Sequence, residues 1–325
     1  MEDKDKSQTE EEEEEEEDEE LIDMDENGNP IKKKEKKNQN STEDYRNVLF
    51  IFLFCVFLGL FLKIFIFNKN IGKNKIFHKF KTPEDMYRNV GEYIIRFVKQ
   101  NPHAKIGLFK SATIDVLYNY LIDRYQKNEV SFKNVKFYSF DGYCGAKKDE
   151  NNSYYYALNN TFLFKTDAQE ENYRLITEEG YSGIDFRQNC KSYNRLLRKD
   201  PIDIQLLSFG ENGTIGFIDE NTDYESFTHR VKLSKEKRIE IYPNFISLER
   251  TPLYAITQGI QNILHAKEVI VIAKGKNKAK AVNDLVNGVF TRKSPISALN
   301  RHSGRVLVFT DEEAGSFIKE YNKKF

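Results

Sequence analysis

Cysteine is scarce in this chain of 325 residues, which contains only Cys55, Cys144 and Cys190. Three scattered cysteines cannot form the disulfide framework of a small secreted domain. Closely spaced cysteine pairs and a His-x-x-x-His pattern are also absent, so the sequence predicts neither a metal site nor a cofactor. No internal repeat is found.

The net charge is only −1, but the two signs of charge are distributed very unevenly along the chain. Residues 1–46 hold 20 acidic and 8 basic residues, whereas residues 47–325 hold 31 acidic and 42 basic ones. A basic region favours anionic partners such as phosphorylated metabolites, anionic lipid or nucleic acid. A solvated basic surface explains the excess equally well, so the sequence predicts no specific nucleic-acid partner.

The acidic end of the chain lacks the apolar residues that a folded core requires. Glu10–Glu20 is an unbroken acidic run, and the basic cluster Lys32–Lys37 follows it. Such a segment cannot bury enough apolar surface to offset the entropy of ordering. We therefore expect a disordered tail over residues 1–46.

The longest apolar run extends from Val48 to Phe67 and is interrupted only by Lys63. A helix of this length matches the roughly 30 Å hydrocarbon core of a bilayer, and the long stem of Lys63 can carry its ammonium group to the headgroups. A cleaved signal peptide would begin nearer the start and end in small residues, which this run does not. The pattern predicts a transmembrane helix at 47–67 and a single-pass membrane protein.

The two flanks of the apolar run carry nearly the same positive charge. Six basic residues lie upstream and five lie downstream, so the positive-inside rule favours neither orientation. The downstream flank, residues 68–81, is expected to be a basic linker to a folded domain at 82–325. Four Asn-x-Ser/Thr sequons occur, but the chain is so rich in asparagine that they do not assign a compartment.

Helical and strand-like segments alternate over the rest of the chain. Thr82-Pro83-Glu84-Asp85 provides an N-cap, a proline at the first helical position and acidic residues for the helix dipole. Apolar runs predict strands at 105–109, 134–141, 202–210, 268–275 and 305–311. Amphipathic segments predict helices from 83 to 100 and near 113–127, 153–164, 184–198, 254–265 and 277–289. This alternation is typical of a doubly wound, mainly parallel α/β sheet.

Ligands in such folds bind at the carboxyl ends of the strands. Four segments follow predicted strands and carry polar residues, namely Lys110–Thr113, Asp141–Gly145, Gly210–Asp219 and Gly275–Lys278. We expect these segments to lie close together and to form the functional site.

Several stretches between residues 82 and 311 resemble the glucosamine-6-phosphate deaminase/isomerase family, which shares its fold with the 6-phosphogluconolactonases. They are SFKNVKFYSFDGYCG with SYYYALNNTF, then YAITQGIQNILHAKEVIVIAKGKNKA, and finally SPISALNRH. The Asp-x-Tyr-x-Gly pattern together with Ser-Tyr-Tyr favours the deaminase branch over the lactonase branch.

The resemblance implies a reaction that opens the sugar ring, moves a proton between C1 and C2, and expels ammonia to leave fructose 6-phosphate. This chemistry needs an acid/base group for ring opening, a carboxylate for the proton transfer and a cradle for the phosphate. The resemblance places the proton-transfer carboxylate at Asp141, although an aspartate at a strand end is also a common turn former. The family usually has an acidic residue next, where this chain has Gly142.

The segment for ring opening departs from the family pattern Gly-x-Asp-Gly-His-x-x-Phe-Asn-Glu-Pro. This chain reads GENGTIGFIDE, with Asn212 at the aspartate position, Thr214 at the catalytic histidine and Asp219 at the glutamate that orients it. A threonine hydroxyl cannot replace a near-neutral imidazole, so the loss should cost on the order of 10²–10⁴ in rate.

The phosphate cradle departs as well, because the family has Thr/Ser-Gly-Gly-Thr/Ser where this chain has FKSAT. Lys110, Ser111 and Thr113 still offer charge and hydroxyls, whereas Ala112 disfavours the positive φ that glycine permits. Lys278 matches the phosphate-contacting lysine of the family. Its phosphate-gripping arginine has no counterpart near Tyr242, although Arg238 lies nearby in sequence, and any single lysine can equally be a solvated surface charge.

These substitutions leave two functions open. One is a membrane-tethered, catalytically impaired module for binding or scaffolding, which the three altered elements favour. The other is an active deaminase that acts through Asp141 with a replacement acid/base such as Asp219 or Glu211. A lectin-like or lipid-facing role based on the basic charge is a third alternative. The expected ligand is a sugar phosphate, and oligomer formation is compatible with the sequence.

Overall fold

The computed structural model describes residues 49–57, 74–179 and 183–318, and the chain divides into two compact units, 1–63 and 64–325. In the first unit, residues 49–57 are helical and their side chains are exposed. Within the described part of the chain, no helix combines the length and the apolar character needed to cross a membrane. The predicted tail at 1–46, and most of the predicted span at 47–67, lie outside the described residues and stay predictions.

The second unit is built on a seven-stranded sheet in which all neighbouring strands are parallel. Its order is β1-β10-β9-β6-β2-β3-β5. The strands are β1 (Lys75–Lys79), β2 (Lys105–Leu108), β3 (Lys136–Ser139), β5 (Tyr173–Arg174), β6 (Ile204–Leu207), β9 (Glu268–Ala273) and β10 (Arg305–Thr310). The predicted parallel α/β sheet is therefore confirmed.

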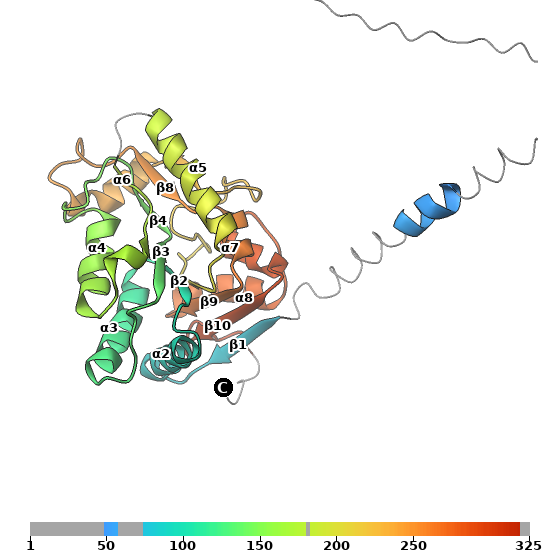
Figure 1. The fold of residues 1–325 in the computed structure, drawn as a ribbon, viewed down its shortest axis with the longest axis horizontal. Helices are drawn as coiled ribbons and strands as arrows, with labels where there is room; N and C mark the ends of the chain where they lie inside the picture. The colour runs from blue at the N-terminus through green and yellow to red at the C-terminus, as the bar shows by residue number, and fades with distance from the viewer. Residues whose placement is uncertain (1–48, 58–73, 180–182, 319–325) are drawn as a thin grey trace, which may run out of the picture. The chain divides into compact units, whose positions relative to one another are not determined.

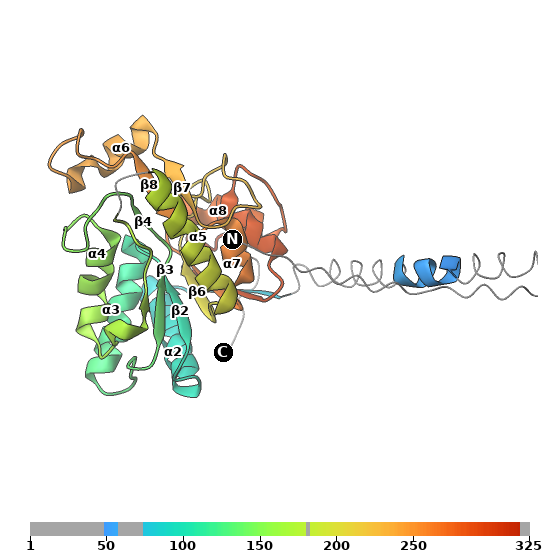
Figure 2. The same ribbon diagram turned by 45° about the horizontal axis from the view of Figure 1, so that its top comes forward.

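Helices cover both faces of this sheet (Figures 1 and 2). On one face, α2 (Pro83–Gln100) packs against α3 (Ala112–Gln126), which contacts α4 (Tyr154–Thr161). On the other face, α5 (Gly183–Lys199) contacts α7 (Ile260–His265), and α8 (Ala279–Val286) contacts the 3-10 helix η5 (Pro295–Arg301). Shorter 3-10 turns span Leu163–Lys165, Glu170–Asn172, Tyr242–Asn244 and Lys276–Lys278.

The central strands are apolar because both of their faces are covered. Every residue of β9 is buried, and Ile270 and Val271 have no exposed surface. Such strands read as continuous apolar runs rather than as alternating patterns. This explains why the sequence predicted the ends of these strands to within three residues.

Helix α2 begins as its sequence predicted. The Thr82 side chain accepts a hydrogen bond from the Asp85 backbone N–H at 3.1 Å, and Pro83 is the first helical residue. Glu84 and Asp85 lie in the first turn, where acidic side chains favour the helix dipole.

The expected linker at 68–81 was wrong in its second half. Residues 75–79 form β1, which pairs in parallel with β10 at the edge of the main sheet. Ile76 and Phe77 pack against the core, while the lysines at either end of the strand are compatible with an edge position. The folded domain therefore begins before residue 82.

A second, three-stranded antiparallel sheet has the order β4-β8-β7. It comprises β4 (Asp141–Tyr143), β8 (Tyr254–Thr257) and β7 (His229–Lys232), and α6 (Lys235–Ile241) follows β7. The predicted helix at 254–265 was therefore wrong over its first six residues, of which four form β8. Ala255, Ile256 and Thr257 are fully buried as a central strand, and the helix begins only after Gly259.

Candidate functional site

A cavity of about 1280 Å³ opens at the carboxyl ends of the parallel strands. It is lined by residues that follow β2, such as Lys110, and by residues that follow β6, such as Ser208. These two strands are adjacent, but the chain leaves β2 toward β3 on one side and leaves β6 toward β9 on the other. Such a switch in direction separates the two connections and leaves a crevice between them.

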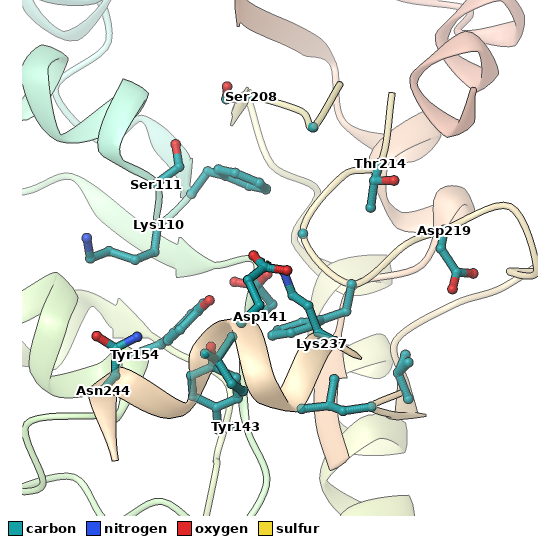
Figure 3. A pocket seen from close by; sticks show the side chains of 18 of the residues that line it. Lys110, Ser111, Asp141, Tyr143, Tyr154, Ser208, Thr214, Asp219, Lys237 and Asn244 are labelled. Carbon is teal, nitrogen blue, oxygen red and sulfur yellow. Dashed lines mark hydrogen bonds and ion pairs between the residues drawn. The ribbon is translucent and has the colours of Figure 1, made fainter. Parts of the chain in front are cut away.

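Asp141 lies at the centre of this cavity (Figure 3). Its residue is 4% exposed, and no hydrogen-bond donor among the described residues reaches its carboxyl group. Burial raises the pKa of this carboxyl well above its usual range; the charge of Glu178 raises it further, and that of Lys237 lowers it. A carboxyl with a raised pKa and no local hydrogen-bond donor suits general acid/base chemistry.

The passage between the two sheets places Asp141 there. Strand β3 ends at Ser139, and after Phe140 the chain enters β4, where Asp141 pairs with Thr257. Gly216 approaches from the opposite loop with a φ of +56°, and a β-carbon on it would lie 2.4 Å from Asp141 Oδ2. The loop can reach Asp141 because residue 216 has no side chain and tolerates this φ.

The loop at 210–220 brings only part of the expected group of residues to the cavity. Thr214 lines it, but Asn212 is exposed and is not among the lining residues. Asp219 lies at the rim, where its carboxylate accepts hydrogen bonds from the Asn221 backbone N–H at 2.9 Å and the Thr222 hydroxyl at 3.3 Å. Glu211 accepts a hydrogen bond from the Asn277 side chain at 2.8 Å.

The polar residues after β2 line the cavity, but their polar groups are engaged locally. Ser111 is the N-cap of α3 and accepts a hydrogen bond from the Ile114 backbone N–H at 3.2 Å. The Lys110 ammonium forms an ion pair with Asp115 at 2.6 Å. Ala112 is the first residue of α3. Thr113 also lines the cavity.

Lys278, in the turn that precedes α8, also lines the cavity. Burial lowers the pKa of its ammonium, and the nearby Glu211 carboxylate opposes this shift. Arg238, by contrast, donates hydrogen bonds to the backbone carbonyls of Leu248 at 2.7 Å and Thr251 at 3.1 Å. It therefore stabilises its own loop and does not line the cavity.

Sequence reasoning missed the contribution of α6. Lys237 lines the cavity close to Asp141, and its ammonium forms an ion pair with Glu240 at 2.8 Å (Figure 3). The available signal was Ser234, which caps this helix by accepting a hydrogen bond from the Lys237 backbone N–H at 3.1 Å. That signal predicts a helix, but it does not predict which side chains reach Asp141.

Aromatic side chains form the floor beside Asp141. The Tyr143 ring makes edge-to-face contacts with Tyr154, at 5.0 Å between centroids, and with Phe217, at 5.6 Å. Phe245 completes this cluster at 5.5 Å from Tyr143. Such pairs stabilise the packing and offer an apolar surface for a sugar ring.

Charges around the cavity nearly cancel. Four lysines and five carboxyl side chains line it. All five histidines of the chain lie within the described residues, and neither a histidine nor an arginine is among the residues that line the cavity.

Comparison with known proteins supplies an independent view of the domain. Residues 81–308 match the family model described as "Glucosamine-6-phosphate isomerases/6-phosphogluconolactonase". A glucosamine-6-phosphate deaminase from Bacillus velezensis is 35% identical over 232 residues, which cover 71% of this chain and 95% of that protein. Glucosamine-6-phosphate deaminase 1 from Bacillus subtilis is 34% identical over 237 residues, which cover 73% and 96% of the two chains.

Solved structures agree with these sequence matches. The structure of a monomeric glucosamine-6-phosphate deaminase superposes with a TM-score of 0.68 and 32% identity, and the match covers 74% of this chain and 98% of that one. A 6-phosphogluconolactonase from Trypanosoma brucei superposes with a TM-score of 0.60 at 17% identity, covering 75% and 98% of the two chains. At that lower identity the likeness shows a shared fold.

Proposed function

The chain belongs to the glucosamine-6-phosphate isomerase/6-phosphogluconolactonase family, and from this premise we propose that its folded domain binds an amino-sugar phosphate beside Asp141 with strongly impaired deaminase activity. The relatives named as glucosamine-6-phosphate deaminases support the ligand class. The composition of the cavity supports the impairment.

The absence of an imidazole from the cavity lining carries this proposal. Thr214 lines the cavity at the position where the family resemblance implies a histidine, and no histidine of the chain replaces it from another element. A threonine hydroxyl remains protonated at neutral pH and cannot exchange a proton with a ring oxygen as imidazole does. Loss of such a general acid/base group typically costs on the order of 10²–10⁴ in rate.

Replacement of that imidazole by Asp219 or Glu211 receives little support from the geometry. Both residues lie at the exposed rim, and their carboxylates already accept hydrogen bonds from other groups. Neither forms a hydrogen bond with Thr214 among the described residues. The carboxylates are thus used to hold loops together instead of activating a neighbour.

Weakened phosphate binding is expected because two of the four lysines that line the cavity, Lys110 and Lys237, are held in ion pairs. Lys110 is paired with Asp115 and Lys237 with Glu240, while Lys278 lies near Glu211. A phosphate dianion would have to compete with these carboxylates for the ammonium groups. Because such pairs are partly exposed, the competition weakens binding without preventing it.

The second candidate is an active deaminase, and the state of Asp141 favours it. The carboxyl lies free in a cavity large enough for a sugar phosphate, and burial raises its pKa toward the range needed for proton exchange. In this alternative Asp141 transfers the proton between C1 and C2 after the ring has opened without help from a histidine. Spontaneous ring opening would then limit the rate.

Membrane attachment is a separate part of the proposal. It rests on the apolar run at 48–67, whose described portion is a helix with exposed Leu49, Phe50 and Phe57 side chains. Alkaline carbonate extraction of the expressed full chain tests it. The full chain should remain with the membrane pellet, and a variant that lacks residues 48–67 should be released. Release of the full chain would contradict the anchor.

Calorimetric titration of the full chain with glucosamine 6-phosphate tests the binding proposal. We expect a dissociation constant in the millimolar range, which Asp141→Asn should alter by less than tenfold because the phosphate provides most of the attraction. Micromolar affinity would show that the lysines are available in spite of their pairing. Absence of any heat up to saturating concentrations would contradict a sugar-phosphate ligand.

A further inference from the structure

Glu178 is a buried carboxylate that lies outside the described cavity. It follows β5, and its residue is 5% exposed. The carboxylate accepts three backbone hydrogen bonds, from the N–H groups of Tyr143 at 2.9 Å, Tyr154 at 3.3 Å and Tyr155 at 2.8 Å. The first donor belongs to β4, and the other two belong to the first turn of α4. One side chain therefore joins the strand of Asp141 to the end of the helix that carries Tyr154.

Gly142 is the neighbour that makes room for this side chain. A β-carbon on residue 142 would lie 2.6 Å from Glu178 Cγ and 2.7 Å from Glu178 Cδ. Successive residues of a strand face opposite sides, so Glu178 packs on the face of β4 that is turned away from Asp141. Glu178 thus occupies the space that a side chain at position 142 would otherwise fill.

We propose that Glu178 is a positioning residue for Asp141, because its carboxylate clamps β4 to the first turn of α4 and so holds Asp141, Tyr143 and Tyr154 in one wall of the cavity. Hydrogen bonds from backbone amides to a carboxylate are among the stronger ones in proteins. Three of them on one buried group fix the relative position of the two elements. The helix dipole of α4 adds a favourable interaction with the same carboxylate.

Electrostatics couple the two buried carboxyls as well. Burial raises the pKa of Glu178 to about 7, against the opposing effect of the three backbone hydrogen bonds. The Glu178 charge is the second cause, after burial, of the raised pKa of Asp141. Two other charges act on this pair: Glu179 in the same loop raises the pKa of Glu178, and Lys237 on α6 lowers that of Asp141. The pair in turn adds to the effect of burial in raising the pKa of Tyr143 on β4 and of Tyr154 on α4, and Glu178 does the same for Cys144 beside β4.

This inference rests on the proposed function only in taking Asp141 as the acid/base group of the site, and its test uses no ligand. Failure to bind a sugar phosphate would therefore count against the proposed function without affecting the test of Glu178.

The experiment titrates the ligand-free full chain by NMR. Its three reporter amides are all tyrosines, so ¹⁵N-tyrosine labelling observes them among only 18 labelled residues. Labelling of aspartate Cγ with ¹³C observes Asp141, which Asp141→Asn assigns. In the wild-type chain, the amides of Tyr143, Tyr154 and Tyr155 should shift together with one midpoint near pH 7, the pKa of Glu178.

Glu178→Gln should abolish this common titration and lower the midpoint of Asp141 by roughly half to one pH unit, because a nearby negative charge has been removed. The matched control is Glu179→Gln, which removes the adjacent exposed carboxylate. The three amides should still shift together, at a lower midpoint because the Glu179 charge raises the pKa of Glu178, and Asp141 should titrate as in the wild type. A purely structural role would not move the Asp141 midpoint.

An unchanged Asp141 midpoint in Glu178→Gln would overturn the proposal. If that variant does not fold, the titration of the wild-type chain decides alone. A midpoint shared by the three tyrosine amides would support the proposal. Three different midpoints, or the lack of any titration, would overturn it.

Discussion

The two walls of the Asp141 cavity differ in how their polar groups are used. On the β4/α4 wall, the Asp141 carboxyl is free toward the cavity, and the Glu178 carboxylate behind it accepts three backbone hydrogen bonds. On the opposite wall, Lys110, Ser111 and Asp219 all face the cavity or its rim, but each is engaged by a local partner. A residue in the right place is therefore not evidence of function unless its polar atoms are also available.

The two walls therefore differ in the chemistry that their side chains can perform. A free, buried carboxyl suits proton transfer, whereas Thr214 stands where the family resemblance implies a histidine and Lys110 is paired with Asp115. If the two walls are this unequal, substitutions on each of them should differ in their effects on stability and on ligand affinity.

The largest effect on stability is expected at Gly216, where the loop after β6 contacts Asp141. Gly216→Ala should destabilise the domain by about 3 kcal/mol, because the new methyl group combines an unfavourable φ with overpacking against Asp141. A β-carbon there would lie 2.4 Å from Asp141 Oδ2. Urea denaturation measures the loss.

Gly145→Ala provides the matched control for that measurement. Gly145 has a φ of +90°, and a β-carbon added to it would meet no atom within 4 Å. Only the backbone strain applies there, so the cost should be about 1–2 kcal/mol. Equal losses in the two variants would show that the loop does not press against Asp141.

A smaller effect is expected from removing the charge of Asp141. The raised pKa means that folding favours the protonated carboxyl of Asp141. The stability that this group contributes is therefore fully present below its pKa in the unfolded chain, about 4, and is lost as the pH rises toward its pKa in the folded chain. Asn cannot ionise, so Asp141→Asn should be more stable than the wild type at pH 8, on the order of 1 kcal/mol.

The gain from Asp141→Asn should disappear when unfolding is repeated near pH 4. Asp123→Asn is the control, because Asp123 is a surface residue paired with Lys127. A variant at position 141 that is less stable than the wild type at pH 8 would mean that the ionised carboxylate has a stabilising partner.

The sequence predicted the main sheet because its strands are buried on both faces and stand out as apolar runs. It did not predict the second sheet, since β4 has only three residues and Tyr254–Thr257 resembles the start of the following helix. It missed β1 as well, because lysines occupy both ends of that edge strand. Short and exposed strands depend on pairing with distant segments, which local patterns do not contain.

The position of Asp141 in the cavity could be predicted because this residue follows a buried strand at the edge where the other polar segments meet. The positions of Glu178 and Lys237 near Asp141 could not be predicted. Glu178 follows β5 and Lys237 lies on α6 after β7, and the pairing of these two strands with distant segments brings both residues close to Asp141. The ion pair between Lys110 and Asp115 was also beyond the sequence, because a spacing of five residues across a helix start does not fix a contact.

The smallest effect is expected on the opposite wall, where Asp115→Asn should release Lys110 and remove a negative charge from the N-terminal turn of α3. Affinity for glucosamine 6-phosphate should rise about three- to tenfold, in line with one partly exposed ion pair and one helix terminus. Calorimetric titration measures it, with Asp123→Asn near the other end of α3 as the control. Unchanged affinity would show that the pairing does not restrain Lys110.

The central claim is that Asp141 can transfer a proton, whereas Thr214 cannot act as the acid/base group that opens the sugar ring. Ammonia release from glucosamine 6-phosphate by the full chain tests this claim most directly. The wild type should release no ammonia above background, Thr214→His should raise release slightly, and Thr214→His with Asp115→Asn should raise it by more than the separate changes combined. Adding Asp141→Asn should return release to background. Robust release by the unmodified chain that Asp141→Asn abolishes would contradict the account, because it would show a working deaminase with a different ring-opening group.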